Sequence, residues 1–450
     1  MLRLLWCSIS LGLCVRQALG LKFAVINLGC KVNRVESDAF VNALLARGFA
    51  QVESAQDANV VVVNTCTVTA QADKKTRKAV RGALRANGFS KVVVTGCACA
   101  LNPESFTAFA PKRVLVAGKA QVLEVIEKLM CESEGDASNT TQVCGAQGKS
   151  CKNNACNTGR LALPKLLRSR VGVKVQDGCN NACSYCIVHV ARGPATSKPA
   201  SKVINECVNF ARAGAREIVL TGINLGSYAD ASRGHNYSLP GLLADLLGAT
   251  KGICGPAPDM PCRFRISSVE PGDVSDELIE LMAKHKGRIC RHMHLPLQSG
   301  SSRVLAEMNR NYTAQEFCEL VQHIYEVVPE MALTTDIICG FPGESDADFE
   351  STLAVARKCH FSKIHAFPYS KREGTPAAAR TDQVSAATIN VRAKQLRELA
   401  SNLRAQDFAA RAGTQEFAIV EVKGTARTES YYKVPVDKQA RIGSLVKVQL

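Results

Sequence analysis

Apolar and polar positions alternate along residues 22–130 in the way that is typical of an α/β domain. Short, almost wholly apolar runs predict strands at 23–28, 60–64, 92–95 and 114–117, and helical spacing predicts helices at 37–47, 73–87 and 121–130. Strands that are apolar on both faces are typical of a parallel sheet covered by helices on both sides. We therefore predict a parallel-sheet α/β domain over residues 22–135.

A second alternation of the same kind predicts strands at 171–175, 217–221, 263–267, 292–297, 333–338 and 363–369, with helices at 202–213, 242–247, 276–284, 314–328 and 346–359. Six strand–helix units exceed a small doubly wound sheet and favour an open or partial barrel of parallel strands. Reactive groups in such folds lie at the carboxyl ends of the strands. We place this barrel domain at 171–412, including a long helix at 384–411.

Two further segments differ in composition. Residues 136–170, rich in Gly, Ser, Asn and Thr, predict a linker, and the short alternating runs of 413–450 predict a small all-β domain. Residues 1–21 hold an apolar stretch between basic ends. This extension resembles a signal peptide or a short organellar transit segment, and a misassigned translation start would also explain it. No central apolar run approaches the length of a membrane span, so we expect no membrane contact.

The positive charge of the chain is clustered. The formal net charge is +16, and residues 61–120 carry ten Lys and Arg against Asp73 and Glu104, while residues 140–175 carry seven and no acid. Clusters of this kind can follow a phosphate backbone, although a solvated helix face would look the same. The predicted RNA contact is the basic helix, which carries Lys74, Lys75, Arg77, Lys78, Arg81 and Arg85.

Three cysteines in the run DGCNNACSYCIV, Cys179, Cys183 and Cys186, have the spacing C-x₃-C-x₂-C. Three thiolates suit an iron–sulfur cluster that keeps one iron open, whereas a structural zinc site normally has four protein ligands. A zinc knuckle completed by His189 is the alternative. Twenty cysteines in so long a chain fit thiol ligands in a reducing compartment better than a disulfide scaffold, which favours a cytoplasmic protein over a secreted one.

A second set of cysteines follows the predicted strands of the first domain. Cys30, Cys66 and Cys97 come directly after the first, second and third strands, at the sheet edge where α/β folds build ligand sites. Helix N-termini at that edge favour thiolate over thiol. We predict a second three-thiolate site there. Unrelated buried thiols are the alternative, and Cys99 is a neighbour that could confuse the assignment.

The ordered motifs LGCKVNRVES, VVNTCTV, VVTGC, DGCNNACSYCIV, EIVLTGIN, RISSVEP, LPLQSGS, DIICGFPGE and FPYSKREGTPA resemble the radical S-adenosylmethionine methylthiotransferases over about residues 22–450. The resemblance implies a cluster domain, a partial (β/α)6 barrel, a small C-terminal β-domain and two 4Fe–4S clusters. It implies that Cys179, Cys183 and Cys186 hold the radical cluster, which binds S-adenosylmethionine, and that Cys30, Cys66 and Cys97 hold an auxiliary cluster that handles sulfur.

The family chemistry implied is the replacement of a C–H hydrogen by methylthio, with S-adenosylmethionine as both methyl donor and radical source. The resemblance places Tyr185 near the adenine of this cofactor, and Gly222, Glu270, Asp336 and Gly340 near its ribose and methionine ends. Ordinary strand-end turns and solvated carboxylates are the alternative for these last four residues. The implied partners are an electron donor of the flavodoxin or ferredoxin type and a sulfur source.

Three branches of this family differ in substrate. They modify tRNA with N6-threonylcarbamoyladenosine next to the anticodon, tRNA with the isopentenyl analogue, or an aspartate of a ribosomal protein. The runs CKVNRVES, TGINLGSY and KREGTPAA favour the first branch. Rival hypotheses are a different radical reaction and a non-catalytic RNA-binding or iron–sulfur carrier protein. The resemblance supplies no role for Cys131, Cys144, Cys151 and Cys156, which we interpret as free thiols, and the β-domain is shorter than is usual for the family.

Overall fold

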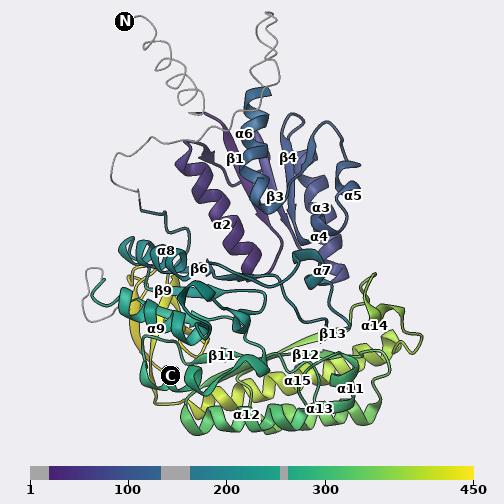
Figure 1. Cartoon of the computed structure of the whole chain (residues 1–450), viewed down its shortest axis with the longest axis vertical. Helices are drawn as coiled ribbons and strands as arrows, with labels where there is room; N and C mark the ends of the chain where they lie inside the picture. Colours follow the sequence, from purple (N-terminus) through teal and green to yellow (C-terminus); the bar gives the residue numbers. More distant parts are fainter. Residues whose placement is uncertain (1–19, 133–162, 254–261) are drawn as a thin grey trace, which may run out of the picture.

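The computed structural model describes residues 20–132, 163–253 and 262–450 (Figure 1). Residues 1–19, most of the predicted linker, and Cys144, Cys151 and Cys156 lie outside the described residues, as does the side chain of Cys131. Two large units are stacked, with the purple and blue N-terminal domain against one side of the barrel. Within the described ranges, no helix is long and apolar enough to cross a membrane.

The N-terminal domain is a parallel sheet with helices on both faces. Its strands are β1 (Lys22–Asn27), β2 (Ala50–Gln51), β3 (Val60–Thr65), β4 (Lys91–Gly96) and β5 (Val114–Val116), in the order β2-β1-β3-β4-β5. Its helices are α2 (Lys31–Ala46), α3 (Ala70–Ala86), α4 (Cys97–Leu101), α5 (Glu104–Thr107) and α6 (Val122–Glu132). Every residue of β3 is buried, because alternate valines enter a separate apolar core on each face. The predicted α/β domain is confirmed.

Helix α2 starts six residues before the predicted helix and directly follows Cys30. Its first turns bury Asn33 and Glu36, which are polar, so the apolar periodicity does not reveal them as part of a helix. The difference matters for the site, because Cys30 stands at the N-terminal end of this helix.

The barrel is built from two parallel three-stranded sheets. One has the order β10 (Arg263–Ile266), β9 (Glu217–Thr221), β6 (Arg170–Lys174), and the other β11 (His292–His294), β12 (Ala332–Cys339), β13 (Lys363–Pro368). Isolated parallel bridges, Phe264 with Ile289 and Ser268 with His294, join β10 to the β11 region. The six strands therefore form one curved wall in chain order, which confirms the partial (β/α)6 barrel.

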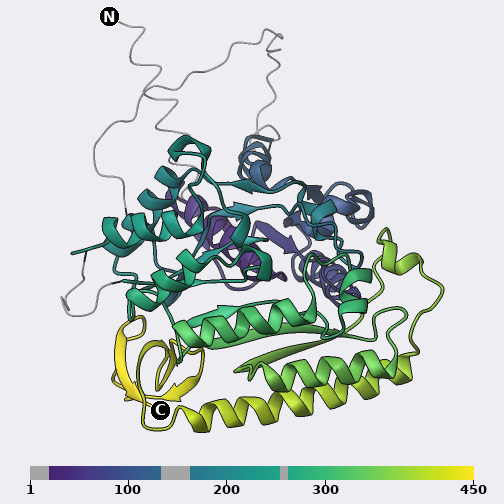
Figure 2. The same ribbon diagram turned by 60° about the horizontal axis from the view of Figure 1, so that its bottom comes forward.

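Helices cover the outside of this wall (Figures 1 and 2). They are α8 (Ala200–Arg212), α9 (Leu239–Ala249), α10 (Asp276–Lys284), α12 (Ala314–Val327), α13 (Asp346–Lys358) and the long α15 (Ala386–Ala410), which packs against β13. Shorter elements shape the barrel mouth: the hairpin of β7 (Gln176–Asp177) and β8 (Thr196–Ser197), and helices α7 (Val188–Arg192), α11 (Ser302–Glu307) and α14 (Pro376–Ala379).

The C-terminal domain is a four-stranded antiparallel sheet, drawn yellow at the end of α15 in Figure 2. Its strands are β14 (Gln415–Val422), β15 (Thr425–Thr428), β16 (Lys433–Pro435) and β17 (Leu445–Gln449). Arg263 and Arg265 of β10 attach it to the barrel by donating to the carbonyl oxygens of Phe417 and Glu429 at 2.8 and 2.7 Å. Both arginines are fully buried and are neutralised by Glu217 of β9, at 2.6 and 2.7 Å.

Candidate active site between two cysteine triplets

Cys30, Cys66 and Cys97 meet at the carboxyl edge of the N-terminal sheet. Cys66 directly follows β3, and Cys97 directly follows β4 as the first residue of α4. Burial raises the pKa of the Cys66 thiol, and the nearness of Cys30 and Cys97 raises it further. The three thiols are thus close enough to interact electrostatically. Cys99 points away, because its thiol donates to the carbonyl oxygen of Val94 at 3.3 Å and burial raises its pKa to about 12.

Two buried asparagines hold this edge together. Asn33 Nδ2 donates to Asn64 Oδ1 and to the carbonyl oxygen of Thr65, both at 2.9 Å, and Asn64 Nδ2 donates back to the carbonyl oxygen of Asn33 at 2.8 Å. Asn33 Oδ1 also accepts from the Cys30 thiol at 3.2 Å. Sequence reasoning missed this pair, although the asparagine ending the apolar run VVVVN is a signal that could have revealed it.

Cys179, Cys183 and Cys186 lie on the loop that joins β7 to α7. Burial, together with the nearness of Cys183 and Cys179, raises the pKa of Cys186 to about 11, so this second triplet also converges. The backbone N–H of Cys179 donates to the carbonyl oxygen of Gly193 at 3.1 Å, which fastens the loop to the C-terminal end of α7. Arg310 donates to the Cys183 sulfur at 3.3 Å through Nη1 and is ion-paired with Glu270 through Nη2.

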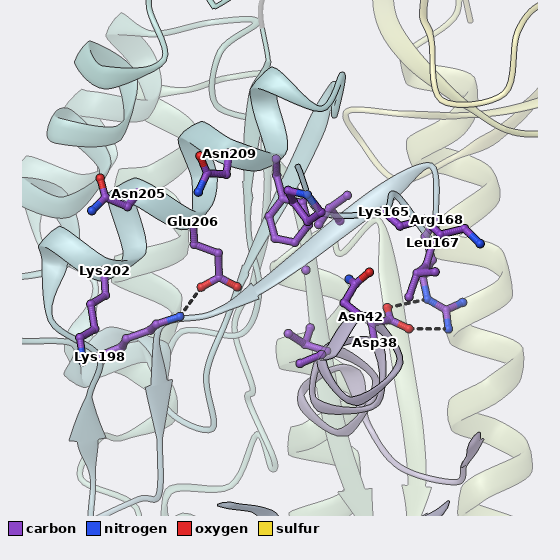
Figure 3. Close-up of a pocket in the computed structure, with 16 residues that line it drawn as sticks. Asp38, Asn42, Lys165, Leu167, Arg168, Lys198, Lys202, Asn205, Glu206 and Asn209 are labelled. Atoms are coloured by element: carbon purple, nitrogen blue, oxygen red, sulfur yellow. Dashed lines mark hydrogen bonds and ion pairs between the residues drawn. The ribbon is translucent and has the colours of Figure 1, made fainter. Parts of the chain in front are cut away.

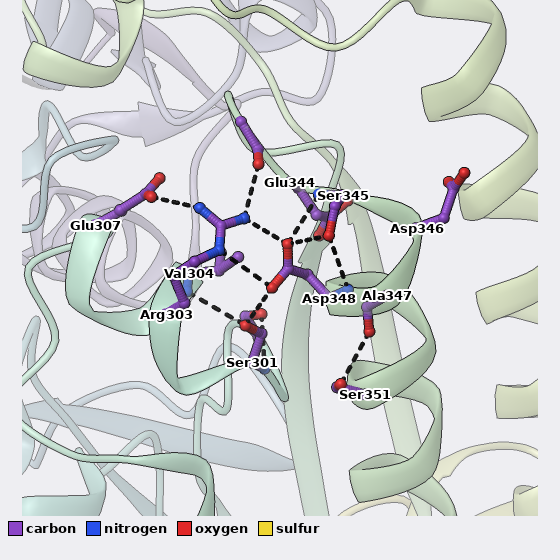
Figure 4. Close-up of polar contacts among 12 residues, drawn as sticks. Ser301, Arg303, Val304, Glu307, Glu344, Ser345, Asp346, Ala347, Asp348 and Ser351 are labelled. Carbon is purple, nitrogen blue, oxygen red and sulfur yellow. Dashed lines mark hydrogen bonds and ion pairs between the residues drawn. The ribbon is translucent and has the colours of Figure 1, made fainter.

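Helix α11 supports this loop from the other side. The hydroxyl of Ser184 donates to the carbonyl oxygen of Glu307 at 2.7 Å, at the end of α11. Figure 4 shows what holds α11 in turn: Arg303 pairs with Asp348 at the start of α13, and the Ser301 hydroxyl donates to the same carboxylate at 2.7 Å. Desolvation opposes ionisation of Asp348, but Arg303, Ser301 and Ser345 outweigh it and lower its pKa.

The donor sets fit iron–sulfur clusters better than single ions. In the described parts of the chain, no three side chains of His, Cys, Asp or Glu are arranged to hold one metal ion. Each triplet instead offers three thiols to a larger group and leaves a position without a protein ligand, which is what a 4Fe–4S cluster with an open iron requires.

The first triplet and one cysteine of the second line adjoining cavities. Cys30, Cys66 and Cys97 line the larger one, of about 540 Å³, and Cys186 lines the smaller one, of about 170 Å³. Four residues line both cavities, namely Val68, Val188, Asp336 and Phe367. The cysteine sites of two different domains therefore face a common space.

The predicted cofactor residues divide into groups. Tyr185 lines the smaller cavity, Gly222 the larger, and Asp336 both, although Asp336 lies inside β12 and not at its end. Glu270 lines neither cavity but contacts Arg310 beside Cys183. Gly340 also lines neither. Its φ is +79°, and a Cβ there would meet Ile389 of α15 at 2.3 Å, so close packing accounts for this glycine.

One arginine links the two domains beside the cavities. Arg192 of α7, whose side chain is 1% exposed, reaches Asp177 at 2.7 Å and Glu36 at 3.1 Å through Nη1. Its Nη2 donates to Asn33 Oδ1 at 3.0 Å and its Nε to the Cys97 sulfur at 3.1 Å. A residue that follows the second triplet in the chain is therefore hydrogen-bonded to a cysteine of the first. Sequence reasoning did not single it out.

The six predicted RNA-contacting residues of α3 are all exposed, while Thr76, Val80 and Ala83 form its buried side. They share one face of the N-terminal domain and do not line the cysteine cavities. Figure 3 shows a separate cavity of about 560 Å³ between α2 and α8, where Asp38 pairs with Arg168 at 2.8 Å and Lys198 pairs with Glu206. No cysteine lines it, so we do not assign the chemistry there.

Models of two families match the chain: the Radical SAM superfamily over residues 173–356, and the Uncharacterized protein family UPF0004 over residues 22–118. Among solved structures, the fold is similar to the radical S-adenosylmethionine methyltransferase TsrM from Kitasatospora setae. The TM-score is 0.53 at 14% identity, over 79% of this chain and 74% of that chain. It is also similar to the cobalamin-dependent radical enzyme OxsB, with a TM-score of 0.51 at 9% identity, over 85% and 56%. Fold and cysteine loop together define a radical SAM enzyme.

Similarity to curated proteins extends over both large domains. The threonylcarbamoyladenosine tRNA methylthiotransferase MtaB of Bacillus subtilis (strain 168) is 34% identical over 94% of this chain and 92% of its own length. Its namesake from Chlamydia pneumoniae is 35% identical over 95% of each chain. The tRNA-2-methylthio-N(6)-dimethylallyladenosine synthase of Geobacillus kaustophilus (strain HTA426) is 31% identical over 91% and 74%. The chain belongs to the radical SAM methylthiotransferase family, whose cofactors are S-adenosylmethionine and 4Fe–4S clusters.

Proposed function

We propose that this enzyme converts N6-threonylcarbamoyladenosine next to the anticodon of tRNA to its 2-methylthio derivative. The observation that carries the proposal is the pair of cysteine triplets facing adjoining cavities, because methylthiolation needs a sulfur-handling site within reach of a radical-generating site. The relatives named for threonylcarbamoyladenosine, at 34 and 35% identity, support this substrate over the dimethylallyl analogue, at 31%. The isopentenyl-tRNA and ribosomal-protein reactions are the alternatives.

We assign Cys179, Cys183 and Cys186 to the radical cluster and Cys30, Cys66 and Cys97 to the auxiliary one. S-adenosylmethionine, when bound, supplies both the methyl group and the radical. The chain's own residues position and shield these groups. Arg310 and Arg192 donate to the Cys183 and Cys97 sulfurs, and such donors tune the potential of a cluster.

The exposed basic face of α3 is the proposed contact for the tRNA backbone, since clustered Lys and Arg bind phosphates without reading sequence. The reaction also needs an electron donor, for which a flavodoxin or ferredoxin is our expectation, and a sulfur source. A reducing, cytoplasmic location remains the prediction from the cysteine content.

The test is nucleoside mass spectrometry of tRNA from a host that lacks the methylthio modification, with and without this gene. Appearance of 2-methylthio-N6-threonylcarbamoyladenosine supports the proposal. Its absence, with the protein made and its iron bound, moves the substrate to one of the two alternatives. A protein that forms no 5′-deoxyadenosine under a strong reductant would be a carrier and not this enzyme.

Variants separate the two triplets. Replacing Cys30, Cys66 or Cys97 by Ala should leave S-adenosylmethionine cleavage intact and abolish the methylthio product, whereas Cys183→Ala should abolish both. Cys99→Ala is the matched control, because Cys99 is buried next to Cys97 in α4 but its thiol is directed to the Val94 carbonyl oxygen. Equal loss of cleavage in both sets would refute the proposed division of labour.

A further inference from the structure

The larger cavity has more positive than negative charge on its walls. Its basic lining residues are Lys31, Arg192, His292, His294, Lys363 and His365, and Asp336 is its single carboxylate among the described residues. Asp336 lies 3.3 Å from His294 Nε2, and Arg192 is neutralised by Glu36 and Asp177. The charges of Lys31 and Lys363 therefore face the cavity without a carboxylate in ion-pair contact in the described part of the chain.

Most of the charged groups around Lys363 are positive. Burial lowers the pKa of its ammonium, and Arg404, Arg427 and Lys31 lower it further, while Tyr431 alone among its main neighbours favours the charged form. Lys363 lies at the start of β13 and Lys31 at the start of α2, directly after Cys30. Two ammonium groups from different domains thus share one end of the cavity, next to the first cysteine triplet.

Tyr431 closes this end from the C-terminal domain. Its backbone has a φ of +72°, a conformation that a tyrosine rarely adopts and that tends to occur at functional positions. Its ring stacks on His292 with centroids 4.8 Å apart, and Lys31 lies 5.5 Å from the ring centroid. All three domains therefore contribute residues to this wall, including the short C-terminal β-domain.

Lys363 is half-buried, whereas Lys31 is exposed. Keeping an unpaired ammonium group half-buried is unfavourable unless a ligand neutralises it. The two adenosines that the tRNA-modifying relatives are named for differ in this respect: the threonylcarbamoyl substituent ends in a carboxylate, and the dimethylallyl substituent is a hydrocarbon. A cavity built for the hydrocarbon would have an apolar wall at this position.

Resting on the proposed function, we propose that Lys31 and Lys363 form a carboxylate-binding subsite. It holds the threonyl carboxylate of the modified adenosine and thereby orients the base between the two cysteine triplets. The subsite favours this substrate in two ways. It binds the anionic substituent, and it disfavours an apolar analogue, whose binding would leave two ammonium groups unpaired. An RNA phosphate has related anionic chemistry, and the experiment distinguishes the two sources.

The experiment uses reconstituted, full-length enzyme with two forms of one tRNA, with and without the threonylcarbamoyl group. Lys363→Met should lower kcat/KM for methylthiolation about 10- to 100-fold, the usual effect of losing a hydrogen bond to a charged group. It should also lower the preference for binding the modified over the unmodified tRNA by a similar factor. Lys363→Arg keeps the charge and should restore most of that preference, and Lys31→Met should resemble Lys363→Met.

Lys433→Met is the matched control, because Lys433 is exposed on β16 and lines neither cavity. Iron content and 5′-deoxyadenosine formation check that each variant is folded. Equal weakening of binding to both tRNAs would mean that the lysines hold a phosphate, and unchanged binding to both tRNAs would mean that they hold neither group; both results overturn the subsite. If wild-type enzyme makes no product from the modified tRNA, the proposed function fails instead, so the two failures are distinguishable.

Discussion

Replacing Arg192 by Met should weaken the junction between the N-terminal domain and the barrel. Met keeps much of the side-chain volume but removes a guanidinium that is 1% exposed and contacts two carboxylates, Asp177 and Glu36. Removing one partner of a buried ion pair costs about 3–5 kcal/mol when the other charge is left alone. Here Lys174 remains 2.9 Å from both carboxylates, so we expect the lower end, about 3 kcal/mol.

The assay is urea unfolding of the cluster-free protein, followed by circular dichroism, with amide hydrogen exchange in α2 and α7 to locate the change. The control is Arg47→Met, because Arg47 pairs with Glu127 at 2.7 Å with side chains 42 and 51% exposed, and such surface pairs contribute at most about 1 kcal/mol. If the Arg192 variant loses no more stability than the Arg47 variant, the network does not hold the domains together.

Three further outcomes follow from particular residues. Burial by itself would raise the pKa of Glu217, but Arg265 and Arg263 outweigh it and lower that pKa to about 2. Protonation of Glu217 should therefore remove about 3 kcal/mol of stability between pH 4.5 and 2, and Glu217→Gln should make the acid unfolding curve less steep by that amount. Gly178→Ala should destabilise the protein and reduce iron at the radical site, because its Cβ would lie 1.9 Å from the Pro194 carbonyl oxygen. Gly193→Ala, also at positive φ but in open space, should do so less. Replacing the six basic residues of α3 by Ala should weaken tRNA binding and flatten its salt dependence; an unchanged slope in filter binding would locate the RNA elsewhere.

The sequence predicts the strands well because burial on both faces leaves a plain apolar signal. It predicts the convergence of Cys30, Cys66 and Cys97 for a related reason, since the carboxyl ends of parallel strands share one edge. It failed where polar residues are buried. Asn33 and Glu36 concealed the start of α2, and β2 is only two exposed residues long.

Contacts between domains were beyond sequence reasoning. Charged residues in a strand are expected to face solvent, and the sequence gives no sign that Glu217, Arg263 and Arg265 differ. They are nevertheless fully buried, because the C-terminal sheet covers them. The role of Arg192 depends in the same way on where α2 lies. Periodicity describes each element separately, and these residues acquire their roles only when the domains are assembled.

The position of Arg192 bears on why the reaction is divided between domains. A sulfur site and a radical site can cooperate only if their separation is fixed. The network of Arg192, Lys174, Asp177 and Glu36 fixes it, because Arg192 and Lys174 of the barrel both pair with Glu36 of the N-terminal domain and are held in place by Asp177. Since Arg192 also donates to the Cys97 sulfur, the junction and the first cysteine triplet are one hydrogen-bonded unit. Loosening the junction should therefore impair methylthio transfer more than S-adenosylmethionine cleavage.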